Sequence, residues 1–219
     1  LCDPSAKPEH IPIDLQLDSG VRLIGTVRND RGLTPGPLRF DMSSLKPKLL
    51  LVSWLDALVL SSAQPEQQWQ AVHVAGGNPA DPRPRVRTFS TTTFNTTRFN
   101  TTGEDPGPHD DPLHPMDALE VVVDLFLRGH REPLPLFPTV SHALYSRPGT
   151  APGAWSKHGG GGDGDDEWIR VAFDDAGFET ITSLAVSEDD PDAYGTDRAT
   201  LYANHLWGTV QHSSPGTEL

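Results

Sequence analysis

Residues 48–63, KLLLVSWLDALVLSSA, constrain the fold of this chain more than any other segment. Hydrophobic side chains occupy nearly every side of a helix built from them, and a helix of that kind is normally buried between other elements. The segment is too short to span a membrane, and Asp56 interrupts it. We expect Ser44 to cap this helix and Pro47 to lie in its first turn.

Strand patterns surround this helix. Residues 11–17 alternate hydrophobic and polar side chains, and the turn sequence Asp-Ser-Gly at 18–20 predicts that residues 21–27 return as an antiparallel partner. Residues 38–42 and 69–74 are predicted as further strands, and residues 168–173 as a late strand because Ile169, Val171 and Phe173 alternate.

Three later segments have helical patterns. Residues 116–131 place Leu119, Val122, Phe126 and Gly129 on one predicted hydrophobic face. Residues 139–146 form a short helix, and residues 197–210 an amphipathic one with Leu201, Tyr202, Leu206, Trp207 and Val210 on its hydrophobic side. The resulting order of strands and helices predicts an α/β fold with a mixed sheet flanked by helices.

Glycine and proline are abundant, at 20 and 21 residues, so long loops are expected. We predict a linker from a preceding domain at 1–10, one domain at 11–212 and a tail at 213–219. Within the domain, residues 82–112 are predicted to be a long irregular or disordered insertion, and 156–167 a flexible Gly/Asp-rich loop. The chain is interpreted as a piece of a longer protein.

The charge of this chain is segregated. The net charge is −13, and residues 163–192 contain eleven acidic side chains but only Arg170 as a base, whereas residues 22–48 contain six basic side chains. This balance argues against broad coating of duplex DNA but leaves a local basic face possible. The single cysteine fits a reducing cytosol, and no signal peptide or membrane span is evident, so a cytoplasmic location is predicted.

One pattern raises the question of metal-dependent nuclease chemistry. Gly25-Thr26-Val27-Arg28 resembles a nuclease Gly-x-x-Asp, but Arg28 stands where a carboxylate would hold Mg²⁺. Asp41-Met42-Ser43 keeps a carboxylate and puts serine where the catalytic lysine belongs. Asp30 is a conceivable displaced ligand, although its surroundings favour a turn. We therefore predict no catalytic residue, no bound metal and no cofactor, with Arg28, Asp41 and Ser43 as degenerate nuclease positions.

Other candidate sites are weaker. His109–His114, HDDPLH, combines metal-ligand side chains in a proline-rich loop without a zinc-site spacing, and is interpreted as a solvated acidic loop. Arginines alternate with phenylalanines in 83–99, which leaves a single-stranded nucleic-acid contact open beside the interpretation as an irregular loop. The predicted DNA-binding candidates are Arg22, Arg28, Arg39, Lys46, Lys48, Arg83, Arg85 and Arg87.

The order of several segments resembles a known family. GVRLIGTV at 20–27, LRF at 38–40 and SSLKPKLLLVSWLDALVLSSA at 43–63 are similar to the C-terminal domain of RecC, the gamma subunit of exodeoxyribonuclease V. MDALEVVVDLFLRGHREPLPLFPTVSHA at 116–143, WIRVAF at 168–173 and LYANHLWGTV at 201–210 continue the resemblance. The resemblance covers most of the chain and is weakest in the insertion at 82–112.

The resemblance implies a restriction-endonuclease-like core, of the PD-(D/E)xK type, that has lost its catalytic residues. It further implies a scaffolding and DNA-handling role in the RecBCD helicase–nuclease, with RecB, RecD and DNA as partners, in double-strand-break repair by recombination. The chain would then be inactive by itself although part of an ATP-dependent exodeoxyribonuclease. Two alternatives remain: an active metal-dependent nuclease with displaced ligands, and a stand-alone protein-interaction domain.

Overall fold

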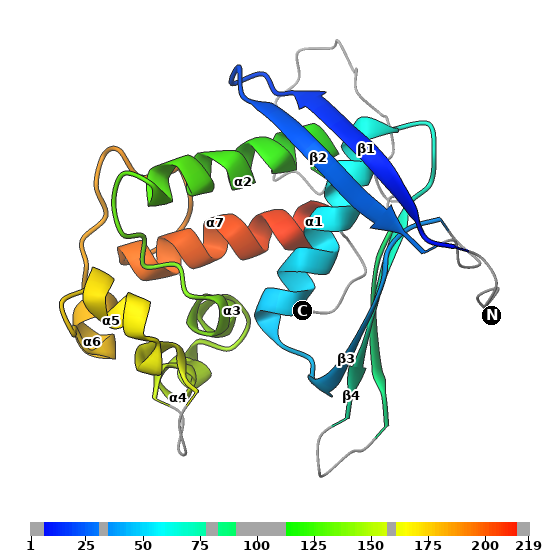
Figure 1. The fold of residues 1–219 in the computed structure, drawn as a ribbon. Helices are drawn as coiled ribbons and strands as arrows, with labels where there is room; N and C mark the ends of the chain where they lie inside the picture. The colour runs from blue at the N-terminus through cyan, green and yellow to red at the C-terminus, as the bar shows by residue number, and fades with distance from the viewer. Residues whose placement is uncertain (1–6, 31–34, 78–82, 91–112, 157–160, 214–219) are drawn as a thin grey trace, which may run out of the picture. The chain divides into compact units, whose positions relative to one another are not determined.

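The computed structural model describes residues 7–30, 35–77, 83–90, 113–156 and 161–213 (Figure 1). The chain divides into two compact units. Unit 1 comprises Leu1–Leu45, Leu50–Glu120 and Val210–Glu218, and unit 2 comprises Lys46–Leu49, Val121–Thr209 and Leu219. Among the described residues, no helix is long and apolar enough to cross a membrane.

The elements follow one another along the chain in this order: β1 (Glu9–Gln16), β2 (Arg22–Asn29), β3 (Leu38–Ser44), α1 (Pro47–Ala63), β4 (Gln70–Gly76), β5 (Arg85–Ser90), α2 (Pro115–Gly129), α3 (Pro138–Ser146), the 3₁₀ turn η2 (Pro148–Thr150), α4 (Ala151–Trp155), the 3₁₀ turn η3 (Asp163–Asp165), α5 (Glu167–Ala172), α6 (Phe178–Ile181) and α7 (Arg198–Ser213).

The first two strands of unit 1 form the predicted hairpin. They pair antiparallel, from Glu9 opposite Asn29 to Gln16 opposite Arg22. Gly20 closes the turn with a φ of 85°, a conformation that glycine adopts without steric cost. The turn is also held from outside, because the Ser19 backbone N–H donates to Glu120 Oε1 at 3.0 Å.

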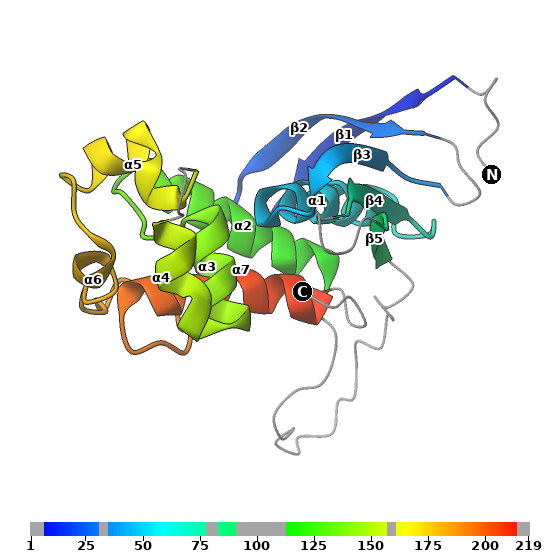
Figure 2. The same ribbon diagram turned by 90° about the horizontal axis from the view of Figure 1, so that it is seen from below.

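A mixed three-stranded sheet, ordered β3-β4-β5, forms the rest of the strand structure in unit 1 (Figure 2). β3 lies parallel to β4, and β4 lies antiparallel to β5. Parallel neighbours require a crossover connection, and α1 supplies it. The predicted α/β class and mixed sheet are thus confirmed, although the β1–β2 hairpin is a sheet of its own.

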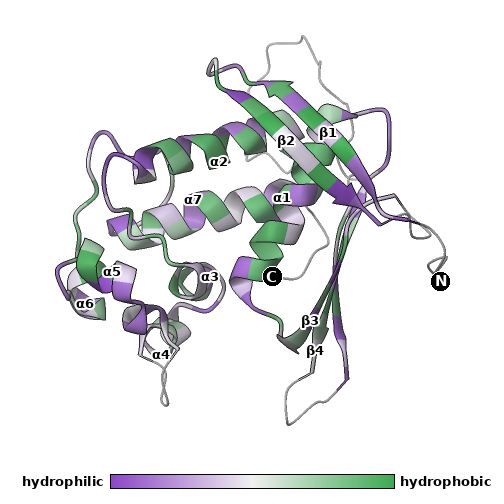
Figure 3. Cartoon of the chain, in the orientation of Figure 1, coloured by the Kyte–Doolittle hydropathy of each residue, from purple (hydrophilic) through white to green (hydrophobic). Residues whose placement is uncertain are grey.

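α1 is hydrophobic along most of its length, as Figure 3 shows. Leu50, Trp54, Leu58 and Leu60 are buried. The expectation that Ser44 caps this helix is wrong, because Ser44 is the last residue of β3 and α1 begins at Pro47. The chain stays extended through Ser44 to pair with Gly76 of β4, which leaves the serine too early to cap.

The interpretation of residues 82–112 as irregular is wrong for Arg85–Ser90, which form β5. β4 offers a free edge, and β5 hydrogen-bonds along it with Phe89 opposite Ala71. Phe89 is buried, so this pairing also adds a large side chain to the core. The interpretation relied on the threonine repeats and on the spacing of the phenylalanines, and it therefore missed the short strand Arg85–Ser90. Residues 91–112 lie outside the described part of the chain.

Unit 2 contains a group of short helices, α3 to α6, around one hydrophobic cluster (Figure 2). The buried members of the cluster are Phe137, Val140, Trp155, Ile181 and Ala199. The short helix predicted at 139–146 is confirmed as α3. The helix predicted at 197–210 is confirmed as α7, and all five of its predicted hydrophobic residues are buried.

The strand predicted at 168–173 is wrong, because these residues form helix α5 and the turn that follows it. The Asp166 carboxylate accepts hydrogen bonds from the backbone N–H groups of Trp168 and Ile169 and so caps a helix. Ile169 and Phe173, four residues apart, pack against the hydrophobic cluster, while Val171 is exposed. The hydrophobic pattern of a segment of only six residues is compatible with a strand and with a helix, and here the Asp166 cap favours the helix.

Two further expectations need correction. The loop predicted at 156–167 is structured where it is described, since Asp163 Oδ2 accepts from the backbone N–H groups of Thr139 and Val140 and thereby caps α3. The hydrophobic face predicted for α2 holds for Leu119 but fails for Phe126, which is 64% exposed and packs edge-on against His130 one turn later. Besides Pro115, the buried residues of α2 are Ala118, Leu119, Val123 and Leu125.

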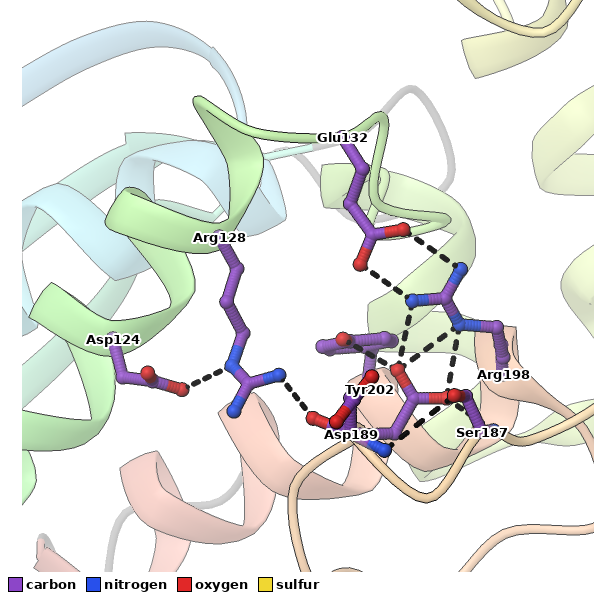
Figure 4. Close-up of polar contacts among 8 residues, drawn as sticks. Asp124, Arg128, Glu132, Ser187, Asp189, Arg198 and Tyr202 are labelled. Carbon is purple, nitrogen blue, oxygen red and sulfur yellow. Dashed lines mark hydrogen bonds and ion pairs between the residues drawn. The ribbon is translucent and has the colours of Figure 1, made fainter.

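A polar network fixes the acidic segment before α7 (Figure 4). Arg198 donates from Nε and Nη2 to the Asp190 carboxylate and from Nη2 to Glu132 Oε1 at 2.8 Å. Asp190 also accepts from the Ser187 backbone N–H and the Tyr202 hydroxyl. Burial raises the pKa of Asp190, but these hydrogen bonds outweigh it and leave the pKa below its ordinary value. Asp190 therefore serves the fold as a buried anion.

We expect Asp190→Asn to lower the free energy of unfolding by about 2 kcal/mol or more, because the Arg198 guanidinium then loses its buried negative partner. Urea unfolding followed by circular dichroism measures this change. The matched control is Asp175→Asn, which removes a carboxylate from an exposed pair with Arg170 and should change stability by less than about 0.5 kcal/mol. Equal effects of the two substitutions would contradict a structural role for the buried pair.

Candidate nucleic-acid interface

Arg28, which the sequence predicts to be a degenerate nuclease position, lies near the end of β2. Its Nε donates to Asp30 Oδ1 at 2.6 Å, and the second oxygen of Asp30 accepts from the Leu38 backbone N–H at 2.9 Å. Both Asp30 oxygens therefore have partners. The arginine side chain is 61% exposed while that of Asp30 is 13% exposed. Asp30, which was considered from the sequence as a displaced metal ligand, thus links the end of β2 to the start of β3.

Arg39 and Asp41 lie on the same face of β3, because alternate residues of a strand share a face. Arg39 donates from Nε and Nη2 to Asp56 Oδ2 of α1, at 2.9 and 2.5 Å. Burial raises the pKa of Asp56 even though the hydrogen bond from Arg39 opposes that shift. Arg39 thus neutralises a partly buried carboxylate, and this contact competes with any contact to a phosphate.

A row of basic side chains crosses the mixed sheet on this face. Arg39, His73 and Arg87 are register partners on β3, β4 and β5. His73 is buried, and its Nδ1 lies 3.0 Å from Ser53 Oγ of α1. His73 Nε2 and Arg87 Nε are buried without a hydrogen-bond partner among the described residues.

His73 was not among the residues predicted from the sequence to be functional. The feature that could have indicated it is a polar residue between Ala71 and Ala75 on the buried face of an alternating strand. Burial lowers the pKa of His73, the charge of Asp41 opposes that shift and the charge of Arg39 adds to it. The imidazole is therefore kept neutral near pH 7, and the row carries its positive charge on the two arginines.

The remaining DNA-binding candidates differ in their surroundings. Arg22 pairs with Asp14 across the hairpin at 2.6 Å, which lowers the pKa of Asp14. Lys46 directly precedes α1 and Lys48 lies in its first turn, and both are exposed. Arg83 and Arg85 are exposed at the start of β5. Lys46 and Lys48 belong to unit 2, and the other six candidates belong to unit 1.

Among the described residues, no three or more His, Cys, Asp or Glu side chains come together in a way that could hold a metal ion. Asp41 shares a face of β3 with Arg39, and its charge acts on His73, the register partner of Arg39. Of the segment 109–114, residues 109–112 lie outside the described part, while His114 precedes α2 and its Nδ1 accepts from the Met116 backbone N–H. Ser43 lies in β3.

Comparison with known families decides the relationship. The family model of the RecC C-terminal domain matches residues 2–147, which run from before β1 to the end of α3. The chain belongs to the RecC C-terminal domain family. The predicted resemblance to RecC is thereby confirmed for this part, while the resemblance of residues 168–173 and 201–210 remains a prediction.

A curated relative supports the same assignment. The RecBCD enzyme subunit RecC of Mycolicibacterium smegmatis is 32% identical over 135 residues, which is 60% of this chain. The matched region spans 10% of that relative's length. No solved structure matches the chain. The restriction-endonuclease-like core is therefore still a proposal, whereas membership in the RecC family is not.

The buried histidine predicts how stability depends on pH. The unfolded chain takes up a proton on His73 as the pH falls through about 6.5, whereas the folded chain resists, so the free energy of unfolding falls between about pH 7.5 and 5.5. Burial lowers the pKa of His142 and His205 in the same direction. We expect His73→Asn to make this pH dependence shallower, by up to about 1.4 kcal/mol per pH unit.

Urea unfolding at several pH values measures the slope, and the exposed His10→Asn variant controls for the loss of a histidine. A slope unchanged in His73→Asn would show that His73 titrates alike in both states.

Proposed function

We propose that this chain is a catalytically inactive, nuclease-like domain of a RecC-type subunit of RecBCD. In this role it scaffolds the helicase–nuclease, contacts RecB and RecD, and helps to handle the separated DNA strands during double-strand-break repair by recombination in the cytoplasm. Family membership supports the assignment to RecC. The domain would belong to exodeoxyribonuclease V without supplying its catalytic residues.

The pairing of Arg28 with Asp30 is the observation that carries the inactive assignment. A cation occupies the position of the first metal ligand, and the nearest replacement carboxylate has both oxygens engaged by protein donors. A site for a hard divalent cation needs several uncommitted oxygen ligands. The mixed sheet, with α1 linking parallel β3 and β4, supports a restriction-endonuclease-like core that keeps the fold without this chemistry.

The first test is cleavage. We expect the purified chain to leave linear DNA intact in Mg²⁺ or Mn²⁺, and Asp41→Ala to make no difference, since one carboxylate beside Arg39 and His73 cannot assemble a metal site. Gel electrophoresis of end-labelled DNA provides the measurement. Metal-dependent cleavage that disappears in Asp41→Ala would instead establish the alternative, an active nuclease with displaced ligands.

The second test concerns DNA contact. We expect Lys46→Ala, Lys48→Ala and Arg85→Ala each to weaken binding to single-stranded DNA equally for all sequences, and to reduce the slope of log affinity against log salt by about 0.7. These cations are exposed, whereas Arg22 and Arg39 are engaged by carboxylates.

Fluorescence anisotropy with a labelled oligonucleotide measures both quantities. Arg170→Ala is the matched control, because it removes one positive charge from the acidic segment of unit 2. If Arg170→Ala weakens binding as much as the others, then only the overall charge matters and the local basic contacts are refuted.

A further inference from the structure

The outer side of α5 carries large hydrophobic side chains that the fold does not use. Trp168 is 81% exposed and Val171, one helical turn later, is 73% exposed. The inner side of the same helix already supplies the core contact, because Ile169 packs against the hydrophobic cluster of unit 2. The other four tryptophans of the chain, Trp54, Trp69, Trp155 and Trp207, are all buried.

Exposed aromatic side chains of this size favour a protein contact over simple solvent exposure. Tryptophan supplies much of the binding energy in protein interfaces, because it buries a large hydrophobic area with little loss of conformational freedom. On α5 the two side chains lie three residues apart and therefore share one face of the helix. Figure 3 shows hydrophobic and hydrophilic residues alternating along this helix.

The charges around this face identify the chemistry of a partner. Between residues 165 and 175 there are five acidic side chains and one basic side chain, Arg170, which is paired with Asp175 at 2.7 Å. Glu167 lies in α5 beside Trp168, and Asp174 follows the helix; both are exposed. Nucleic acid and acidic proteins are repelled by such a surface, whereas lysine and arginine are attracted both by the carboxylates and by the face of the tryptophan ring.

The acidic side chains that the fold requires are different ones. Asp163 caps α3, Asp166 caps α5, Asp190 binds Arg198, and Asp197 accepts from the Thr200 backbone N–H in the first turn of α7. Glu167 and Asp174 are exposed and make none of these structural contacts. Their carboxylates are thus available to a ligand in solution.

We propose that the outer face of α5 is a docking surface for a lysine- and arginine-rich segment of a partner polypeptide. Trp168 and Val171 contact a hydrophobic side chain of that segment, and Glu167 and Asp174 pair with its cations. The surface lies outside residues 2–147, which match the RecC family, and the proposal does not depend on the inactive nuclease assignment.

The experiment uses the 219-residue chain and a fluorescently labelled peptide of alternating lysine and leucine. A peptide of alternating lysine and serine has the same charge without hydrophobic side chains. We expect the lysine–leucine peptide to bind more tightly than the lysine–serine peptide, and to shield Trp168 from quenching by acrylamide. Trp168 dominates that quenching because the other tryptophans are buried.

We expect Trp168→Ser to weaken peptide binding about thirtyfold or more, the size of an interface hot spot. Glu167→Gln should weaken it less and lower its salt dependence. The matched control is Ile24→Ser, which removes another exposed hydrophobic side chain, one that lies outside the acidic segment. Circular dichroism checks that each variant is folded.

Three outcomes would overturn the proposal. Equal affinity of wild-type and Trp168→Ser would mean that the peptide follows the bulk negative charge alone. Equal affinity for the two peptides would remove the hydrophobic contact. Loss of oligonucleotide binding in Trp168→Ser would assign this face to nucleic acid instead.

Discussion

The crossover from β3 through α1 to β4 is the constraint on which unit 1 depends. Two adjacent parallel strands cannot be joined by a tight turn, so a helix must carry the chain back along the sheet. In this chain that helix is hydrophobic on most sides, and it is bound to both strands by polar contacts, Arg39 with Asp56 and Ser53 with His73. Burial of α1 and pairing of the strands therefore stabilise one another.

The Arg39 contact starts from β3, the strand that contains Asp41 and Ser43, two positions where the sequence suggested lost metal chemistry; the third, Arg28, lies on β2 of the separate hairpin. A catalytic metal site holds carboxylates close together, and their repulsion must be offset by the ion. Here arginines pair with the carboxylates instead, so the charges are balanced within the protein.

The sequence predicted the elements whose hydrophobic periods extend over several turns or strand residues. The β1–β2 hairpin, α2 and α7 are such cases, whereas α1 was predicted from its nearly continuous hydrophobic sequence. It failed where six residues fit two periods, as in α5, and where a strand exists because a neighbour offers a free edge, as in β5. His73 and the Arg198 network depend on residues far apart in the chain, which no local pattern reveals.

The Arg39 contact has a consequence for how mutational scans of this domain can be interpreted. A guanidinium that neutralises a partly buried carboxylate cannot be removed without leaving that carboxylate uncompensated. An Arg39 variant that loses DNA binding would therefore report unfolding as readily as a lost phosphate contact. A loss of stability can be distinguished from a loss of the proposed DNA contact at the exposed Lys46 and Lys48, but not at this arginine.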